Sequence, residues 1–183
     1  MTITTAKWTI ADYHAMIAAG ILDDRPVELI HGEIIEMAPE GEPHAYFSTA
    51  SGHYLVQLLG DRALVRPAKP ITLPNDSEPE PDIAIVQRLG REYLSHHPYP
   101  ENIFWLIEYA NTSLNKDLEI KRRLYAEVQI PEYWVVNLQT QQLIVFRDPQ
   151  NGDYNTRFTL TEGIISPLAF PDVSVTVAAI VSP

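Results

Sequence analysis

The chain contains no cysteine and only 8 glycines among its 183 residues. The absence of cysteine excludes disulfides, thiolate metal sites and cysteine nucleophiles, and it is typical of a reducing compartment. The glycines stand singly, and the sequence has no Walker loop, no G-x-G-x-x-G loop and no G-x-S-x-G turn. We therefore expect no nucleotide cofactor.

The sequence also lacks a long hydrophobic run and an excess of positive charge. The apolar stretches 16–22 and 173–181 are far shorter than the ~20 residues that a bilayer requires. No signal-peptide pattern is present, so we expect a cytoplasmic protein without membrane contact. The formal net charge of -11 argues against tight non-specific binding to DNA, because nucleic-acid binders usually carry a basic surface. An enzyme that contacts phosphates locally through metal ions remains compatible with this charge.

The length and the hydrophobic content of 45% predict one domain, residues 1–183, with a sizeable core. Helices are expected at 9–20, 44–59 and 111–128, the last capped by Thr112 or Ser113. Strands are expected at 27–30, 33–37, 63–67, 69–73, 82–86, 103–109, 132–137 and 142–147, with two more after them. A loop or broken helix is expected at 87–102. This order predicts an α/β or α+β fold, a mixed β-sheet with helices packed on it.

Two carboxylates stand at the ends of strands that are otherwise apolar. Asp82 follows Pro81 in SEPEPDIAIV, and Glu108 lies near the end of the strand 103–109. If the strands are neighbours, the carboxylates converge at one edge of the sheet, where they share a proton or hold a cation. Hard oxygen ligands suit Mg²⁺ or Mn²⁺. The alternative is that each acid ends a strand and pairs with a basic side chain.

The helix expected after Glu108 carries further candidates. Asp117, Lys121 and Tyr125 are spaced by four residues, so they line one stripe. A lysine with a half-buried stem and an amine that reaches Glu108 would be a suitable catalytic group. The alternative is an ordinary surface ion pair between Asp117 and Lys121.

Other residues are candidates for accessory roles. His44 follows Pro43 at the start of a helix, where it contacts phosphate, acts as an acid, or is simply exposed to water. The same helix as Lys121 carries Arg122 and Arg123, which would supply the local basic surface that an acidic protein needs for DNA.

These motifs together resemble the Uma-two family, bacterial proteins of the restriction-endonuclease-like PD-(D/E)XK superfamily. The matching pieces are Pro81-Asp82, WLIEYANTS at 105–113, Asp117, Lys121, Tyr125-Ala126 and IPEYWVVN at 130–137. The stretch VELIHGEIIEMAP at 27–39, followed by His44, is similar to the opening of the family.

The sequence departs from the superfamily pattern at two positions. A plain (D/E)XK motif would place a lysine at position 110, where Ala110 stands. The resemblance implies that Lys121 supplies this group from the following helix. Tyr109 stands where the family has a small or aliphatic residue, and we expect its side chain to lie on the opposite face of the sheet. The resemblance also implies that Glu28 reaches the same site as a metal ligand or water-orienting group, against the alternative of a surface acid on an edge strand.

The resemblance implies a restriction-endonuclease-like mixed sheet with an N-terminal helix and β-hairpin. It also implies an endonuclease that uses Mg²⁺ or Mn²⁺ to hydrolyse phosphodiester bonds, most readily of DNA, with a homodimer by analogy. Asp82 and Glu108 would hold the metal, and Lys121 would orient the nucleophile.

Two other functions are compatible with the sequence. The first is a catalytically inactive binding or assembly module of the same fold, which the charge of -11 favours. The second is a glycosidase pair of carboxylates. It is the weaker alternative, because Trp8, Trp105 and Trp134 lie in or beside apolar runs and not around a sugar cleft.

Overall fold

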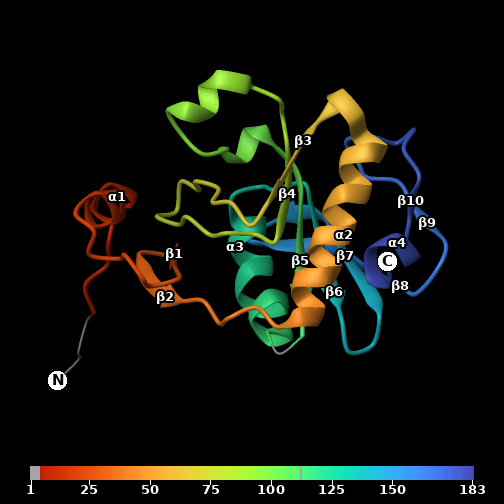
Figure 1. Ribbon diagram of the computed structural model, residues 1–183, viewed down its shortest axis with the longest axis horizontal. Coiled ribbons are helices and arrows are strands. Elements are labelled where there is room, and N and C mark those ends of the chain that lie inside the picture. Colours follow the sequence, from red (N-terminus) through yellow and green to blue (C-terminus); the bar gives the residue numbers. More distant parts are fainter. Residues whose placement is uncertain (1–4, 112) are drawn as a thin grey trace.

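The computed structural model describes residues 5–111 and 113–183 and has a six-stranded mixed sheet at its centre (Figure 1). The strand order is β3-β4-β5-β6-β7-β8, in which β5 and β6 are parallel and the other neighbours are antiparallel. The strands are β3 Leu64–Pro67, β4 Ile83–Val86, β5 Ile103–Ala110, β6 Glu132–Asn137, β7 Gln142–Gln150 and β8 Asp153–Leu160. The expected mixed sheet flanked by helices is confirmed.

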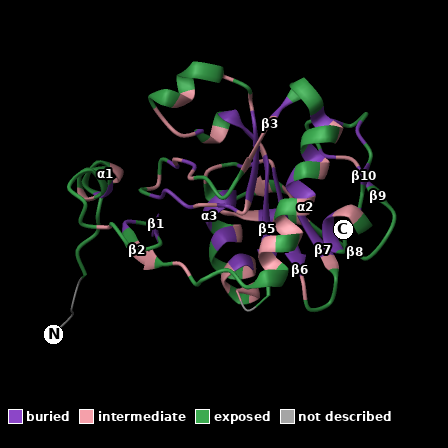
Figure 2. Ribbon diagram, in the orientation of Figure 1, coloured by how far each residue is buried: buried purple, intermediate pink, exposed green. Residues whose placement is uncertain are grey.

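The central strands β5 and β6 are rich in β-branched and aromatic residues, and all of β6 is buried (Figure 2). A parallel pair needs a crossover connection, and here the chain crosses through a helix that ends with α3, Arg122–Glu127. Helix α2, Glu42–Leu59, and the short α4, Ala178–Val181, cover the other face. The sheet is therefore buried on both faces, which explains its nearly continuous apolar strands.

Alternation along β5 sends neighbouring side chains to opposite faces. Tyr109 packs in the cluster that includes Leu55 of α2. Leu106 and Ala110 pack in the cluster on the α3 face. Glu108 shares the α3 face with them because side chains in a strand alternate with a period of two. The expected orientation of Tyr109, away from Glu108, is confirmed.

The N-terminal helix and hairpin lie beside the sheet, at the left of Figure 1. They are α1, Ile10–Ala18, and the antiparallel strands β1, Val27–Ile30, and β2, Glu33–Glu36. The hairpin turn has positive φ at His31 (48°) and at Gly32 (73°), as a type I′ turn requires. A backbone hydrogen bond of 2.8 Å from Glu78 N to Leu29 O fastens the hairpin to the loop that precedes β4.

Three segments differ from the sequence expectation. The expected strand at 69–73 is a loop, because Ala68 adopts positive φ (43°) and Pro70 has no N–H to donate. The expected helix at 111–128 contains a π-helix, Lys116–Lys121, before α3. The C-terminal region forms the short strands β9, Ile164–Ile165, and β10, Val175–Thr176, and ends in α4 and not in a strand.

The remaining helical elements are short 3₁₀ helices. They span Gly60–Arg62, Gly90–Leu94 and Pro100–Asn102, the last two within the segment expected to be a loop or broken helix. Thr112, the alternative helix cap, lies outside the described residues. Among residues 5–111 and 113–183, no helix combines the length and the apolar character needed to cross a membrane.

Candidate active site

Most of the expected site residues line a cleft of ≈ 630 Å³ between the hairpin, the loop before β4, the end of β5 and the start of α2. The titratable residues that line it are Glu28, Glu36, Glu40, His44, Glu80, Asp82, Glu108, Tyr109, Lys116, Asp117 and Lys121. The cleft therefore brings Asp82, Glu108, Lys121, Glu28, His44 and Asp117 together, as the sequence predicts.

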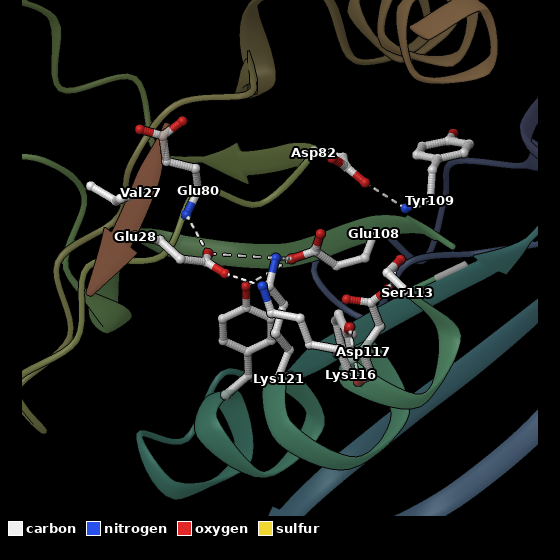
Figure 3. Close-up of polar contacts among 12 residues, drawn as sticks. Val27, Glu28, Glu80, Asp82, Glu108, Tyr109, Ser113, Lys116, Asp117 and Lys121 are labelled. Atoms are coloured by element: carbon white, nitrogen blue, oxygen red, sulfur yellow. Dashed lines mark hydrogen bonds and ion pairs between the residues drawn. The ribbon is translucent and has the colours of Figure 1, made fainter. Parts of the chain in front are cut away.

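Asp82 stands at the mouth of β4, which pairs directly with β5. Its Oδ2 accepts a 2.6 Å hydrogen bond from the backbone N of Tyr109 and lies 3.0 Å from Nε2 of His44. The strands β4 and β5 are therefore neighbours, which is the condition for the two carboxylates to converge. Asp82 and Glu108 enter the same cleft from adjacent strands (Figure 3).

Glu108 is buried on the α3 face of the sheet. Its Oε1 accepts hydrogen bonds of 2.9 Å from Nζ of Lys121 and of 2.9 Å from Oη of Tyr125. Burial raises the pKa of Glu108 to about 8, and the carboxylates of Asp82 and Asp117 add to this effect while Lys121 opposes it. The pKa of Glu108 is therefore higher than is usual for a glutamic acid, although Lys121 lies next to it.

Lys121 is buried between two carboxylates. Besides its bond to Glu108, its Nζ lies 3.7 Å from Oε2 of Glu28. Burial alone would lower the pKa of Lys121, but Glu108 and Glu28 outweigh it, so the net shift is upward and the amine stays charged. Burial also excludes the alternative of an ordinary surface pair between Asp117 and Lys121.

Glu28 is fully buried in β1, so it is not the exposed edge-strand acid of the alternative interpretation. Lys116 donates to its Oε1, and the backbone N of Glu80 lies 3.4 Å from its Oε2. Burial would raise the pKa of Glu28, but Lys121 and Lys116 together lower it below its ordinary value. Glu28 is therefore a charged group of the cleft.

Two accessory candidates border the same space. Asp117 accepts a 2.7 Å hydrogen bond from Oγ of Ser113, and burial raises its pKa. The hydrogen bond to Asp82 raises the pKa of His44, whose Nδ1 lies 3.8 Å from Glu40.

A metal ion has suitable ligands at the Asp82 side of the cleft. Glu40, His44 and Asp82 each offer one ligand atom, and these atoms lie within 4.8 Å of one another. Carboxylate oxygens suit Mg²⁺ and Mn²⁺, and an imidazole suits later transition metals. This donor set fits a divalent cation. One of its three residues, Glu40, was not among the residues that the sequence indicated.

Two predicted residues lie elsewhere. Arg122 contacts Asp153 of β8 at 3.2 Å, and Arg123 lies 3.8 Å from Glu119, so neither lines the cleft. Lys116 does line the cleft, but it was not among the site residues that the sequence indicated. No sequence signal marks it, because its position depends on the π-helix.

Comparison with known proteins agrees with this arrangement. The family model described as "Uma2: Putative restriction endonuclease" matches residues 10–178. The chain is also similar to a solved structure described as "a putative nuclease belonging to DUF820" from Anabaena variabilis. The TM-score is 0.69 and the identity 16%, over 85% of this chain and 89% of that chain, a likeness that shows the fold alone. No curated protein matches the chain.

The fold and the cleft define a protein of the restriction-endonuclease-like class. The chain belongs to the Uma2 (Uma-two) family, since the family model matches most of its length. Membership supports a nuclease-type function that acts on nucleic acid.

Proposed function

We propose that the protein is an endonuclease that depends on Mg²⁺ or Mn²⁺ and hydrolyses phosphodiester bonds of DNA. One observation carries the proposal. Asp82 and Glu108 enter one cleft from paired strands, and Lys121 contacts Glu108 there at 2.9 Å. Lys121 would thus supply, from the following helix, the amine that a plain motif places at position 110.

Asp82 and Glu108 would hold the cation, and Glu40 and His44 offer further ligand atoms beside Asp82. A bound divalent cation lowers the pKa of a coordinated water and offsets charge on the scissile phosphate. The donor set explains why Asp82 is tolerated at the mouth of a buried strand, where an isolated charge would be costly.

The remaining groups of the cleft would position the reactants. Lys121 stays charged, so it can orient the attacking water or stabilise negative charge that develops on the phosphate. Glu28 holds Lys121 from the other side, which fixes the direction of the amine. The products are a phosphate monoester end and a hydroxyl end, because the bond from phosphorus to the leaving oxygen breaks as the bond to the water oxygen forms.

The inactive binding or assembly module remains the rival function, and the net charge of -11 favours it. The two are separated by incubating purified protein with supercoiled plasmid and with a labelled duplex, in Mg²⁺, in Mn²⁺ and in EDTA. We expect cleavage by the wild type in either metal and none in EDTA or by Asp82→Asn. The control is Asp24→Asn, which removes an equal charge at an exposed position with positive φ (64°), where asparagine is well tolerated.

Cleavage that persists in Asp82→Asn would place the chemistry elsewhere, and a wild type that never cleaves would favour the inactive module. A homodimer and a cytoplasmic location stay predictions from the sequence and the family resemblance.

A further inference from the structure

Two lysines of one helix contact a single buried carboxylate. Lys116 donates to Oε1 of Glu28, and Nζ of Lys121 lies 3.7 Å from its Oε2 (Figure 3). Glu28 comes from the N-terminal hairpin, so the lysines reach across the cleft to another part of the chain.

The π-helix Lys116–Lys121 makes this convergence possible. In an α-helix, residues five apart differ in direction by about 140°, at about 100° per residue. In a π-helix, residues five apart are joined by the backbone hydrogen bond, so they lie near one another. Lys116 and Lys121 are five apart, and the wider helix brings both amines to the cleft. Irregular turns of this kind occur often at functional sites.

The two amines differ in how firmly they are held. The side chain of Lys121 is 7% exposed and lies between Glu28 and Glu108. The side chain of Lys116 is 29% exposed, and Glu28 is its one recorded partner among the described residues. An ammonium has three donors, so Lys116 keeps donors for a ligand in the cleft. If Lys116 leaves Glu28, that carboxylate still has Lys121 and the backbone N of Glu80.

We infer that Lys116 is a substrate-binding residue. When DNA enters the cleft, the amine of Lys116 moves away from Glu28 and contacts a non-bridging phosphate oxygen of the DNA. The inference rests on the proposed function, since it assigns the backbone contact of the same site. In the free protein, Glu28 keeps the amine directed into the cleft, so less conformational freedom is lost when a phosphate binds. The other residues expected to contact DNA, Arg122 and Arg123, do not line the cleft.

The acidity of the cleft favours a phosphate contact through an accessible amine. The cleft is lined by several carboxylates, whereas Lys116 and Lys121 are its only lysines among the residues that the structure describes. A phosphate that approaches this surface needs a cation that is accessible, and Lys121 is buried between carboxylates. Lys116 is therefore the lysine in position to meet the backbone of the substrate.

The test compares wild type, Lys116→Gln, Lys116→Arg and Lys7→Gln by fluorescence anisotropy with a labelled duplex in EDTA, from ~50 to ~200 mM salt. Lys7→Gln is the control for charge. Lys7 is exposed, and its ion-pair partner among the described residues is Glu33 on the hairpin surface. We expect Lys116→Gln to weaken binding about fivefold and to reduce the slope of log K against log salt by about 0.9, the loss of one phosphate contact. Lys116→Arg should retain the slope, and Lys7→Gln should match wild type.

Steady-state cleavage in Mn²⁺ adds a readout that a purely structural role would not give. Lys116→Gln should raise KM about fivefold and leave kcat within about twofold, because the contact is made equally in the ground and transition states. A salt slope equal to that of wild type would overturn the role of Lys116 and leave the proposed function standing. A wild type that neither binds nor cleaves DNA would overturn both.

Discussion

Nζ of Lys121 lies 2.9 Å from Oε1 of Glu108, although one residue belongs to a helix and the other to a central strand of the sheet. Both groups are buried, so the contact is shielded from solvent. A lysine adjacent to a carboxylate at a strand end is the arrangement that the PD-(D/E)XK pattern requires, and here the lysine comes from a different element.

Replacing Lys121 should lower stability. In Lys121→Met, the buried acceptors on Glu108 and Glu28 lose a donor, and we expect the free energy of unfolding to fall by about 2 kcal/mol. Urea denaturation measures this change. The double variant Lys121→Met/Glu28→Gln should recover part of it, because the carboxylate that needed the cation is then neutral. A loss of only about 0.5 kcal/mol in the single variant would indicate a weak surface-type pair instead.

Lys121 should also matter for the chemical step. In single-turnover cleavage with saturating Mn²⁺, we expect Lys121→Met to be slower by a hundredfold or more, about 3 kcal/mol of transition-state stabilisation. Lys121→Arg should not restore the rate, because a planar guanidinium is a poor substitute for a compact ammonium in a buried space. Wild-type rates in a folded Lys121→Met protein would contradict this role.

The stability of the metal-free protein should fall as the pH rises. Burial raises the pKa of Glu108 from the ordinary 4.5 to about 8, so the folded state holds a proton that the unfolded state has released. The stabilisation is complete below pH 4.5 and is lost as the pH rises through about 8. Glu108→Gln cannot titrate, so the difference between the variant and wild type isolates this effect. Urea unfolding at several pH values in EDTA should show wild type losing stability relative to the variant across this window.

Divalent metal should stabilise the folded protein. At roughly ten times the dissociation constant, we expect Mn²⁺ to add about 1.4 kcal/mol and to raise the Tm by about 4 °C. Asp82→Asn should show no such rise, while Asp24→Asn should respond as wild type does. Differential scanning fluorimetry with a Mn²⁺ titration measures the shift, and an equal response of Asp82→Asn would remove that residue from the metal site.

An ion pair of another buried carboxylate, whose residues do not line the cleft, offers a structural comparison. Arg147 donates to Oε1 of the fully buried Glu132 at 2.6 and 2.9 Å, and Glu132 also accepts from the backbone N of Leu168 at 2.7 Å. We expect Arg147→Met to lower the free energy of unfolding by about 3 kcal/mol. The response of Arg147→Met to metal and its cleavage rate should stay as in wild type, when both are measured below the temperature at which the variant unfolds. A selective loss of cleavage would contradict the separation of this pair from the site.

Much of the arrangement could be predicted from the sequence because it depends on local pattern. Alternation in IFWLIEYA places Glu108 and Tyr109 on opposite faces, which follows from the two-residue period of a strand. The pairing of β4 with β5, which the sequence left open as a condition, is present in the structure. The spacing of Lys121 and Tyr125 also holds, since both side chains contact Glu108.

The rest depends on contacts between distant segments. Lys116 enters the cleft through a π-helix, and a stripe drawn with α-helical spacing places it elsewhere. Glu40 approaches Asp82 because the loop before α2 folds back on the start of β4. The segment 69–73, expected to be a strand from its apolar residues, is a loop, because the positive φ of Ala68 turns the backbone out of the extended conformation. Such features reflect packing and backbone strain, which periodicity does not encode.

A crystal structure of the protein soaked in Mn²⁺ would show whether Asp82 and Glu108 hold a divalent cation in this cleft. Anomalous difference density identifies the metal and its position without reference to activity. We expect a peak within ligand distance of Asp82 and Glu108, and no peak there in Asp82→Asn crystals soaked in the same way. A cleft without anomalous density at saturating Mn²⁺, or a peak bound only to other residues, would contradict this expectation.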